Sequence, residues 1–373
     1  MSLRSLCCGP YQIDNASMPR LYVGNFDFEH DLASGPRELP RAVRSLAADL
    51  VSAWIAVSEP EDVIWSPTGA PAYDFHDLKN LGMTPPRWVS REDDLPRGAD
   101  WELVPWGWTS QWVAFGRAHG WSCPAPPLDI VRQVNSRIFR CELEQELGIA
   151  PSGSAVLRSM AELLAHVAQQ VTDDAGWVLK ANFGMAGRER VVGRGPRVGE
   201  PALNWARRRL VQSDTGLVFE PWLERAAEAG LQWDIPASGE PRLLGITPLL
   251  TDAGGTYRGS RIVCSDVELS DWQPAVEVTL QVARRLQQLG YWGPLGIDAM
   301  RYRTASGEIL CRPLQDLNAR FTMGRLALGL RRFVPTGCSA EWLHDADLVA
   351  LAVALNPAVS VMQTTARSWL LTT

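Results

Sequence analysis

The stretch Gly293–Leu330, GPLGIDAMRYRTASGEILCRPLQDLNARFTMGRLALGL, carries the pattern that decides the fold. Two apolar runs, Leu295–Met300 and Glu308–Leu314, flank the polar link Thr304–Gly307. Short apolar runs on either side of a turn are typical of a β-hairpin. The stretch therefore predicts two adjacent antiparallel strands.

Both predicted strands carry oxygen-bearing side chains. Asp298 lies on the first strand, whereas Asp316 and Asn318 lie two residues apart at the end of the second and so face the same side. Carboxylate and amide oxygens suit a hard cation such as Mg²⁺, and the following Arg320 suits a phosphate. A solvated hairpin face with ordinary polar residues explains this stretch equally well.

The composition is that of a globular protein. The chain has 373 residues, 46% hydrophobic and 21% charged, with a net charge of −6, which is enough for two or three packed units. The net charge gives no electrostatic argument for binding nucleic acid or an anionic membrane. The seven scattered cysteines form no CxxC pair, so neither a disulfide framework nor a zinc site is predicted. We find neither a signal peptide nor a membrane span and expect a soluble, cytoplasmic protein.

The first third of the chain alternates short apolar runs with a helical pattern. Strands are predicted at Leu21–Asn25, Asp62–Trp65 and Trp101–Pro105, with a helix over 39–57. This alternation predicts a small open α/β unit with parallel strand pairing. Its many tryptophans are interpreted as core or interface packing, and the proline-rich segment 122–128 as a linker.

The middle of the chain holds a glycine-rich hairpin. A helix is predicted over 129–147, and Ser159 with Glu162 forms a capping box for another. The strand Trp177–Lys180 then leads into the glycine- and arginine-rich Asn182–Arg190. Free backbone N–H groups there can cover a polyphosphate, although no P-loop motif is present and a plain basic hairpin fits equally well. Lys180 is one of only two lysines.

Apart from the opening stretch, the elements predicted after residue 216 are a strand that ends in a bend, a second hairpin and two helices. The strand Leu217–Leu223 should end its regular pairing at Pro221 and leave a bend, which would suit an adenine. A second hairpin is predicted from Arg242–Asp252 and Gly259–Cys264. An amphipathic helix over Pro274–Leu289 precedes the opening stretch. A last helix is predicted over about 340–355, followed by a tail.

In this order the motifs resemble the ATP-grasp superfamily. They are VNSR at 134–137, WVLKANFGMAGRER at 177–190, FEPWL at 219–223, GPLGIDAM at 293–300 and DLNAR at 316–320. The resemblance implies a small open α/β pre-ATP-grasp domain followed by a two-lobed ATP-grasp fold with antiparallel sheets. The implied boundaries are 1–128 for the pre-domain, 129–222 and 223–337 for the two lobes, and 338–373 for a helix and tail.

The resemblance also implies roles for individual residues around ATP and Mg²⁺. The residues implied to contact the phosphates are Arg137, Lys180, Gly184, Gly187 and Arg188, with Arg258 or Arg261 as a further candidate. The backbone around Glu220–Leu223 is implied to bind the adenine, with Trp222 beside the ring. Glu228 or Glu224 is implied to bind the ribose. The metal ligands are Asp298, Asp316 and Asn318. Arg320 steadies the transferred phosphoryl group or a substrate carboxylate, so that Arg320 and Lys180 are the catalytic pair.

Two positions depart from the family pattern. Asp316 stands where many members have glutamate, and the shorter side chain puts affinity for a second cation in doubt. Arg137 stands where many have lysine, but arginine keeps the charge and can bind phosphate through two N–H groups.

The implied activity is a carboxylate–amine (or carboxylate–thiol) ligase that forms an acyl phosphate and releases ADP and phosphate, acting on small-molecule or peptide substrates. We expect the substrate near Gly24–Asp27 and the Trp106–Trp112 segment. A hydroxyl-phosphorylating kinase and a nucleotide-binding scaffold without catalysis stay open as alternatives. The tryptophan-rich first unit and the apolar run Leu348–Leu355 could form contacts in a homo-oligomer.

Overall fold

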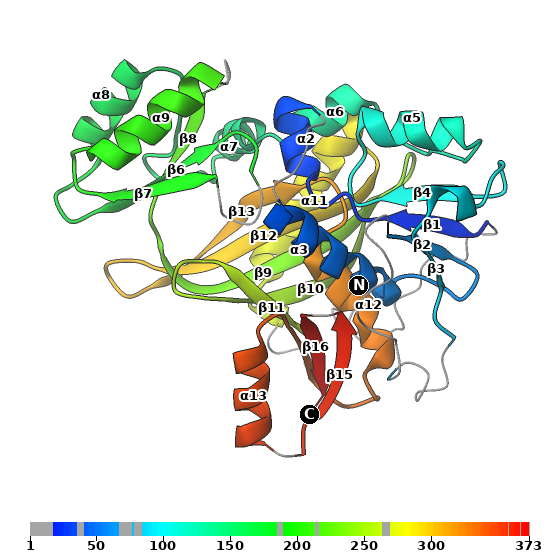
Figure 1. Cartoon of the computed structure of the whole chain (residues 1–373). Helices are drawn as coiled ribbons and strands as arrows, with labels where there is room; N and C mark the ends of the chain where they lie inside the picture. Colours follow the sequence, from blue (N-terminus) through cyan, green and yellow to red (C-terminus); the bar gives the residue numbers. More distant parts are fainter. Residues whose placement is uncertain are drawn as a thin grey trace.

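The structure, a computed structural model, describes residues 18–35, 41–66, 77, 84–184, 189–212, 216–262, 269–356, 358–365 and 367–372. Three sheets organise these residues (Figure 1). The first has four strands in the order β3-β2-β1-β4, the second four in the order β5-β8-β6-β7, and the third eight in the order β13-β12-β9-β10-β11-β14-β16-β15.

The first sheet is parallel throughout, which confirms the predicted open α/β unit. Its strands are β1 (Arg20–Val23), β2 (Val63–Trp65), β3 (Arg87–Val89) and β4 (Glu102–Pro105). Around it lie α2 (Phe28–Ser34), α3 (Arg41–Val51), the 3₁₀ turns η1 (Ser52–Ala56) and η2 (Glu92–Asp94), and α5 (Ser110–Ala118). All three residues of β2 are buried, as expected of a parallel strand covered on both faces. The helix predicted over 39–57 is thus α3 followed by η1, with its first residues outside the described part.

The second sheet is antiparallel. It contains β5 (Ala155–Leu157), β6 (Gly176–Ala181), β7 (Arg190–Arg194) and β8 (Leu217–Pro221), accompanied by α6 (Leu128–Val134), α7 (Arg137–Glu146), α8 (Met160–Gln170) and α9 (Glu200–Gln212). As predicted, β8 ends at Pro221, and Ser159 caps α8 by accepting the Glu162 N–H at 3.1 Å.

The single helix predicted over 129–147 is wrong, because the chain breaks it into α6 and α7. The Asn135 side chain leaves the helical pattern to accept the Ala319 N–H at 2.9 Å. The next residue, Ser136, starts α7 by accepting the Phe139 N–H at 3.2 Å. Asparagine and serine side chains that bond to backbone groups favour helix ends over helix interiors.

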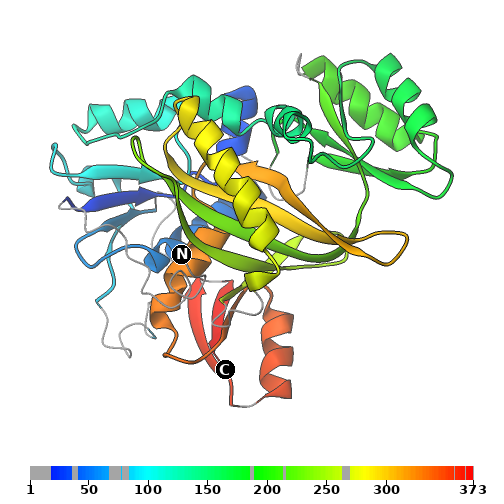
Figure 2. The same cartoon turned by 180° about the vertical axis from the view of Figure 1, so that it is seen from behind.

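The third sheet is antiparallel and contains the predicted hairpin. Its first part comprises β9 (Glu224–Ile235), β10 (Arg242–Thr251), β11 (Tyr257–Ile262), β12 (Gly293–Arg303) and β13 (Ile309–Asn318), with the helices α11 (Gln273–Gln288) and α12 (Met323–Leu330) and the 3₁₀ turn η3 (Arg331–Phe333). Figure 2 shows α11 lying across the face of this sheet. Both predicted hairpins are present, although the last two residues of Gly259–Cys264 lie outside the described ranges.

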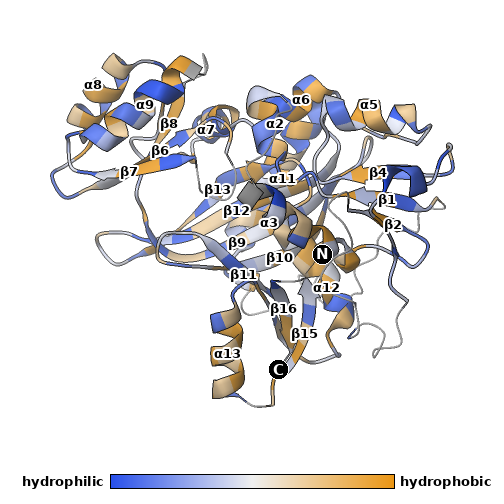
Figure 3. Cartoon of the chain, viewed as in Figure 1, coloured by the Kyte–Doolittle hydropathy of each residue, from blue (hydrophilic) through white to orange (hydrophobic). Residues whose placement is uncertain are grey.

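The C-terminal segment corrects the sequence analysis. Instead of one helix over 340–355 and a tail, it forms β14 (Ala340–Leu343), α13 (Ala346–Leu355), β15 (Ser360–Thr365) and β16 (Ser368–Thr372). These strands extend the third sheet from β11. Asp345 caps α13 by accepting the Asp347 N–H at 3.0 Å, which sets the start of the helix. Figure 3 shows the predominantly apolar colouring of α13.

The core ties the first unit to the third sheet. One hydrophobic cluster joins residues of the first sheet and its helices, such as Trp54 and Trp106, with buried residues of the third sheet. Trp54 packs against Phe321 with a ring-centroid distance of 4.9 Å. Trp106 and Trp121, two of the tryptophans that were interpreted as packing residues, are buried. The second sheet has a core of its own with α8 and α9. Within the described ranges, no helix combines the length and apolar character needed to cross a bilayer.

Candidate functional site

The β12–β13 hairpin brings the predicted oxygen ligands together. Asp298 and Asp316 lie directly opposite each other in the strand register, and Asn318 lies opposite Gly296. Alternate residues of paired strands share a face, so the three side chains lie on one face. The Asn318 Nδ2 donates to Asp298 Oδ2 at 3.3 Å. The sequence-predicted trio is thus a contiguous cluster.

The charges in this cluster repel one another. Burial, together with the carboxylates of Asp316 and Glu228, raises the pKa of Asp298 to about 7. Burial also acts to raise the pKa of Asp316, but the cations of Arg137 and Lys180 hold that pKa below its ordinary value. Buried like charges of this kind are costly without a counterion.

The donor chemistry of the cluster fits a hard cation. Two partly buried carboxylates lie face to face beside an amide, which is the oxygen set that Mg²⁺ prefers. Among the residues that the structure describes, no group of three or more His, Cys, Asp or Glu side chains is arranged to hold a metal. The candidate site therefore depends on two carboxylates and the Asn318 amide.

Arg320 lies next to this cluster and is held from three sides. Its Nη2 donates to Asn318 Oδ1 at 2.9 Å, and its Nε donates to Glu29 Oε1 at 2.6 Å. The guanidinium lies 5.4 Å from the ring centroid of Trp106. Glu29 is on α2, so the first unit fixes the predicted catalytic arginine, a contact that the sequence analysis missed.

Lys180 belongs to a buried ionic cluster made of Arg140, Glu144, Lys180, Glu220 and Arg312. The Lys180 Nζ lies 2.7 Å from Glu220 Oε2. Arg140 pairs with both Glu144 and Glu220, and Arg312 donates to both carboxylates. Three cations face two carboxylates, which leaves one positive charge unmatched.

The ionic cluster lowers the pKa of both Glu220 and Lys180, which favours the charged form of Glu220 and the neutral form of Lys180. Burial acts against ionised Glu220, but Arg312, Lys180 and Arg140 hold its pKa well below the ordinary value. Burial, aided by repulsion from Arg140 and Arg312, lowers the pKa of Lys180 despite its pairing with Glu220. The Lys180 ammonium would therefore gain from a further anion.

Arg137 connects the glycine hairpin with the carboxylate cluster. Its Nη2 donates to the Gly184 carbonyl oxygen at 2.8 Å and lies 3.6 Å from Asp316 Oδ2. A Cβ at Gly184 would come within 2.5 Å of Glu189 Cβ, so a larger residue would not fit. Gly187 and Arg188, also predicted to contact phosphates, lie outside the described residues.

The bend between β8 and β9 opens onto a cavity of about 780 Å³, here called the hinge cavity. Its lining comprises Trp222–Glu228, Leu249–Ala253, Arg258, Asp345 and Leu348. Trp222 and Leu223 thus lie where an adenine was predicted. Glu220 does not line this cavity, and its side chain belongs to the ionic cluster.

The two residues in each pair of alternatives, Glu228 or Glu224 and Arg258 or Arg261, lie in different surroundings. Glu228 is buried and accepts from Thr251 Oγ1 at 2.8 Å and from Gln315 Nε2 at 2.9 Å, whereas the Glu224 side chain is 73% exposed. Arg258 lines the hinge cavity, and Arg261 pairs with Glu341 elsewhere. We therefore keep Glu228 and Arg258.

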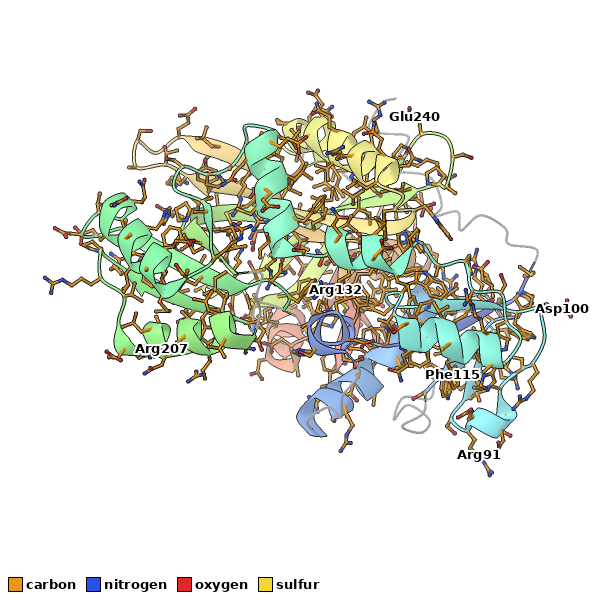
Figure 4. The ribbon with its side chains drawn as sticks, turned by 90° about the horizontal axis from the view of Figure 1, so that it is seen from above. Arg91, Asp100, Phe115, Arg132, Arg207 and Glu240 are labelled. Carbon is orange, nitrogen blue, oxygen red and sulfur yellow. The ribbon has the colours of Figure 1, made fainter. Side chains whose placement is uncertain are left out.

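A second cavity, of about 210 Å³, lies between the first and third sheets and is here called the interface cavity. Trp106, Gly107 and Trp108 line one side, and Tyr291, Arg320 and Arg325 are on the other. The predicted segment Gly24–Asp27 does not line it. Figure 4, seen from above, places Arg132 near the centre of the view beside α2; its Nε donates to the Leu32 carbonyl oxygen at 3.0 Å.

Comparisons with known proteins give structural matches only. No model of a protein family and no curated protein sequence matches the chain. Among solved structures, N5-carboxyaminoimidazole ribonucleotide synthetase from Thermus thermophilus is 13% identical, with a TM-score of 0.52 over 95% of this chain and 93% of that one.

Two further solved structures hold nucleotides. N5-carboxyaminoimidazole synthase from Aspergillus clavatus, in complex with ADP and 5-aminoimidazole ribonucleotide, is 13% identical, with a TM-score of 0.51 over 95% and 93% of the two chains. The biotin carboxylase domain of Hydrogenobacter thermophilus 2-oxoglutarate carboxylase, a dimer with MgADP and bicarbonate, is 11% identical, with a TM-score of 0.50 over 88% and 75%. This chain has the ATP-grasp fold.

Within the ATP-grasp fold, sequence reasoning missed the partners that hold its own site residues. Arg140 and Glu144 stand four residues apart on α7, a spacing typical of a helical ion pair. This signal was present in the sequence. Arg312 is 168 residues from Glu144 and 92 from Glu220, and no local pattern connects them.

Proposed function

We propose that the chain is an ATP- and Mg²⁺-dependent ligase that activates a carboxylate as an acyl phosphate for attack by an amine. The observation that carries this proposal is the cluster of Asp298, Asp316 and Asn318 beside Arg320 on the β12–β13 hairpin. The charge of Lys180 also acts on Asp316 of this cluster.

The nucleotide would bind across the bend between β8 and β9. The hinge cavity is within the volume range of small-molecule sites, with Trp222 available for the adenine ring and Glu228 for the ribose hydroxyls. Lys180 and Arg137 would bind the phosphates, whose charge balances the unmatched positive charge of the ionic cluster.

Asp298, Asp316 and Asn318 would hold Mg²⁺, which neutralises phosphate charge when bound. Phosphoryl transfer depends on positioning and on stabilisation of spread negative charge. A substrate carboxylate oxygen attacks the γ-phosphorus while the bond to the ADP oxygen breaks, and Arg320 stabilises the transferred group. The amine nitrogen then attacks the acyl carbon, and phosphate leaves.

The substrates would enter through the interface cavity, because Arg320 lies on its wall and also contacts Asn318. The cavity is small and lined by aromatic rings, which fits small molecules. The first unit thus acts as the pre-ATP-grasp domain over 1–128, with lobes over 129–222 and 223–337. The segment 338–373 adds strands to the second lobe.

The first test is a thermal-shift titration with ATP, with and without Mg²⁺, on the wild type and on Lys180→Ala. A ligand that binds only the folded state raises the melting temperature. We expect a Mg²⁺-dependent rise that Lys180→Ala loses. No shift at millimolar ATP would contradict the proposal.

Product analysis then separates the reaction classes. ADP release that requires an added carboxylate indicates the ligase. A phosphorylated product formed without a carboxylate would indicate a kinase, and ATP binding without turnover on any substrate would indicate a scaffold.

A further inference from the structure

Arg312 joins the two lobes at the point where the proposed nucleotide-binding lysine is held. Arg312 is on β13 of the third sheet, whereas Glu144 is on α7 and Glu220 on β8. All three side chains are almost fully buried. The buried position of Arg312 is unusual for an arginine, because a buried guanidinium is tolerated only when it is fully paired.

The guanidinium makes four hydrogen bonds to two carboxylates. It donates from Nε to Glu144 Oε1 and from Nη2 to Glu144 Oε2, both at 2.9 Å. It also donates from Nη1 to Glu220 Oε2 and from Nη2 to Glu220 Oε1, both at 3.0 Å. Such paired contacts fix orientation as well as charge. The same Glu220 Oε2 lies 2.7 Å from Lys180 Nζ.

A β-bulge brings Arg312 to this place. Asp298 pairs with Asp316, but Met300 pairs with Arg312, so three residues of β13 lie opposite the single residue Ala299. Bulges redirect side chains and are common beside functional sites. The bulge thus lies between the proposed metal ligands and the arginine that reaches the first lobe.

We propose that Arg312 is a positioning residue for Lys180 and, through it, for the nucleotide phosphates. Arg312 occupies both oxygens of Glu220 and both of Glu144, so Glu220 is fixed in place and its charge is shared. Without Arg312, the charge of Glu220 would be shared by two cations in place of three and would hold Lys180 more strongly. Phosphate would then compete with a stronger pairing. The inference rests on the proposed function.

A purely structural role for Arg312 makes a different prediction. If the arginine only joined the lobes, its loss would weaken the binding of every ligand between the lobes, including a ligand without phosphates. If Arg312 acts through Lys180, its loss weakens the binding of nucleotides and leaves the binding of adenosine unchanged. Adenosine and ADP therefore distinguish the two roles.

The experiment measures dissociation constants of MgADP and adenosine by isothermal titration calorimetry. The variants are Arg312→Met, Arg312→Lys and Lys180→Met, with Arg284→Met as the control. Arg284 is on α11 and pairs with Glu240 at the surface at 2.9 Å. We expect Arg312→Met to weaken the binding of MgADP on the order of tenfold, as for the loss of a charged hydrogen bond. The affinity of this variant for adenosine, and both affinities of the control variant, should stay within about twofold of the wild-type values.

The double variant adds a second criterion. In the Lys180→Met background, Arg312→Met should change MgADP affinity little further, since residues that act through one another are non-additive. If Arg312→Met does not fold, Arg312→Lys carries the test, because lysine keeps the charge but cannot bind two carboxylates through a planar fork. Arg312→Lys should weaken the binding of MgADP and leave the binding of adenosine unchanged.

The possible failures are distinguishable. Absence of MgADP binding by the wild type would overturn the proposed function and this inference with it. Wild-type binding together with unchanged affinity in the Arg312 variants, with equal losses for adenosine and MgADP, or with additive effects in the double variant, would overturn this inference alone.

Discussion

Replacement of Glu220 by glutamine probes the ionic cluster through stability. The change keeps the shape of the side chain but removes the carboxylate that Arg140, Lys180 and Arg312 share. Loss of one partner from a buried ion pair costs about 3–5 kcal/mol. An unfolding entropy of about 2.1 cal/mol/K per residue over 373 residues gives roughly 0.8 kcal/mol/K. The melting temperature should therefore fall by about 4–6 °C if the chain unfolds in one transition.

Differential scanning calorimetry without ligands measures this effect. The control is Glu240→Gln, whose carboxylate is 73% exposed and pairs with Arg284; it should melt within about 1 °C of the wild type. The folded-state pKa of Glu220 is depressed below its ordinary value of 4.5. Its stabilisation is thus complete above pH 4.5 and declines as the pH falls further. A Glu220→Gln protein that melts within about 1 °C of the wild type at pH 7 would refute the reasoning.

Three further predictions concern separate parts of the chain. Asp298→Asn should raise the melting temperature of the metal-free protein, because it relieves repulsion from Asp316 and Glu228, and should abolish Mg²⁺-dependent ATP turnover; full turnover would exclude Asp298 as a metal ligand. Trp222→Ala should weaken ATP binding by about tenfold through lost ring stacking, and unchanged binding in a fluorescence titration would place the adenine elsewhere. Burial lowers the pKa of His344 to about 4, so its stabilisation is complete above pH 6.5 and is lost as the pH falls through 4. His344→Phe should accordingly flatten the dependence of melting temperature on pH across that window, and an unchanged slope would contradict this assignment.

The elements that the sequence indicated are those with local signals. The β12–β13 hairpin, the strands β6 and β8 and the amphipathic helix α11 each have their apolar pattern within one short segment, because periodicity depends on neighbouring residues. The break at Asn135 and Ser136 had a local signal as well, yet the continuous apolar stripe concealed it. The long strand β9 and the strands after α13 were missed because their pairing partners, and not their own patterns, define them.

For the candidate site, the sequence by itself determined the chemical identities of the groups: the carboxylates of Asp298 and Asp316, the Asn318 amide, and the charges of Lys180 and Arg320. Their spacing on one hairpin was sufficient, because alternate strand residues share a face. Only the tertiary structure decided what holds them. Glu29 reaches Arg320 across 291 residues, and Arg312 reaches Glu144 across 168. Such pairs follow from how the sheets pack and where a bulge shifts the register, and neither is set by residues adjacent in the chain.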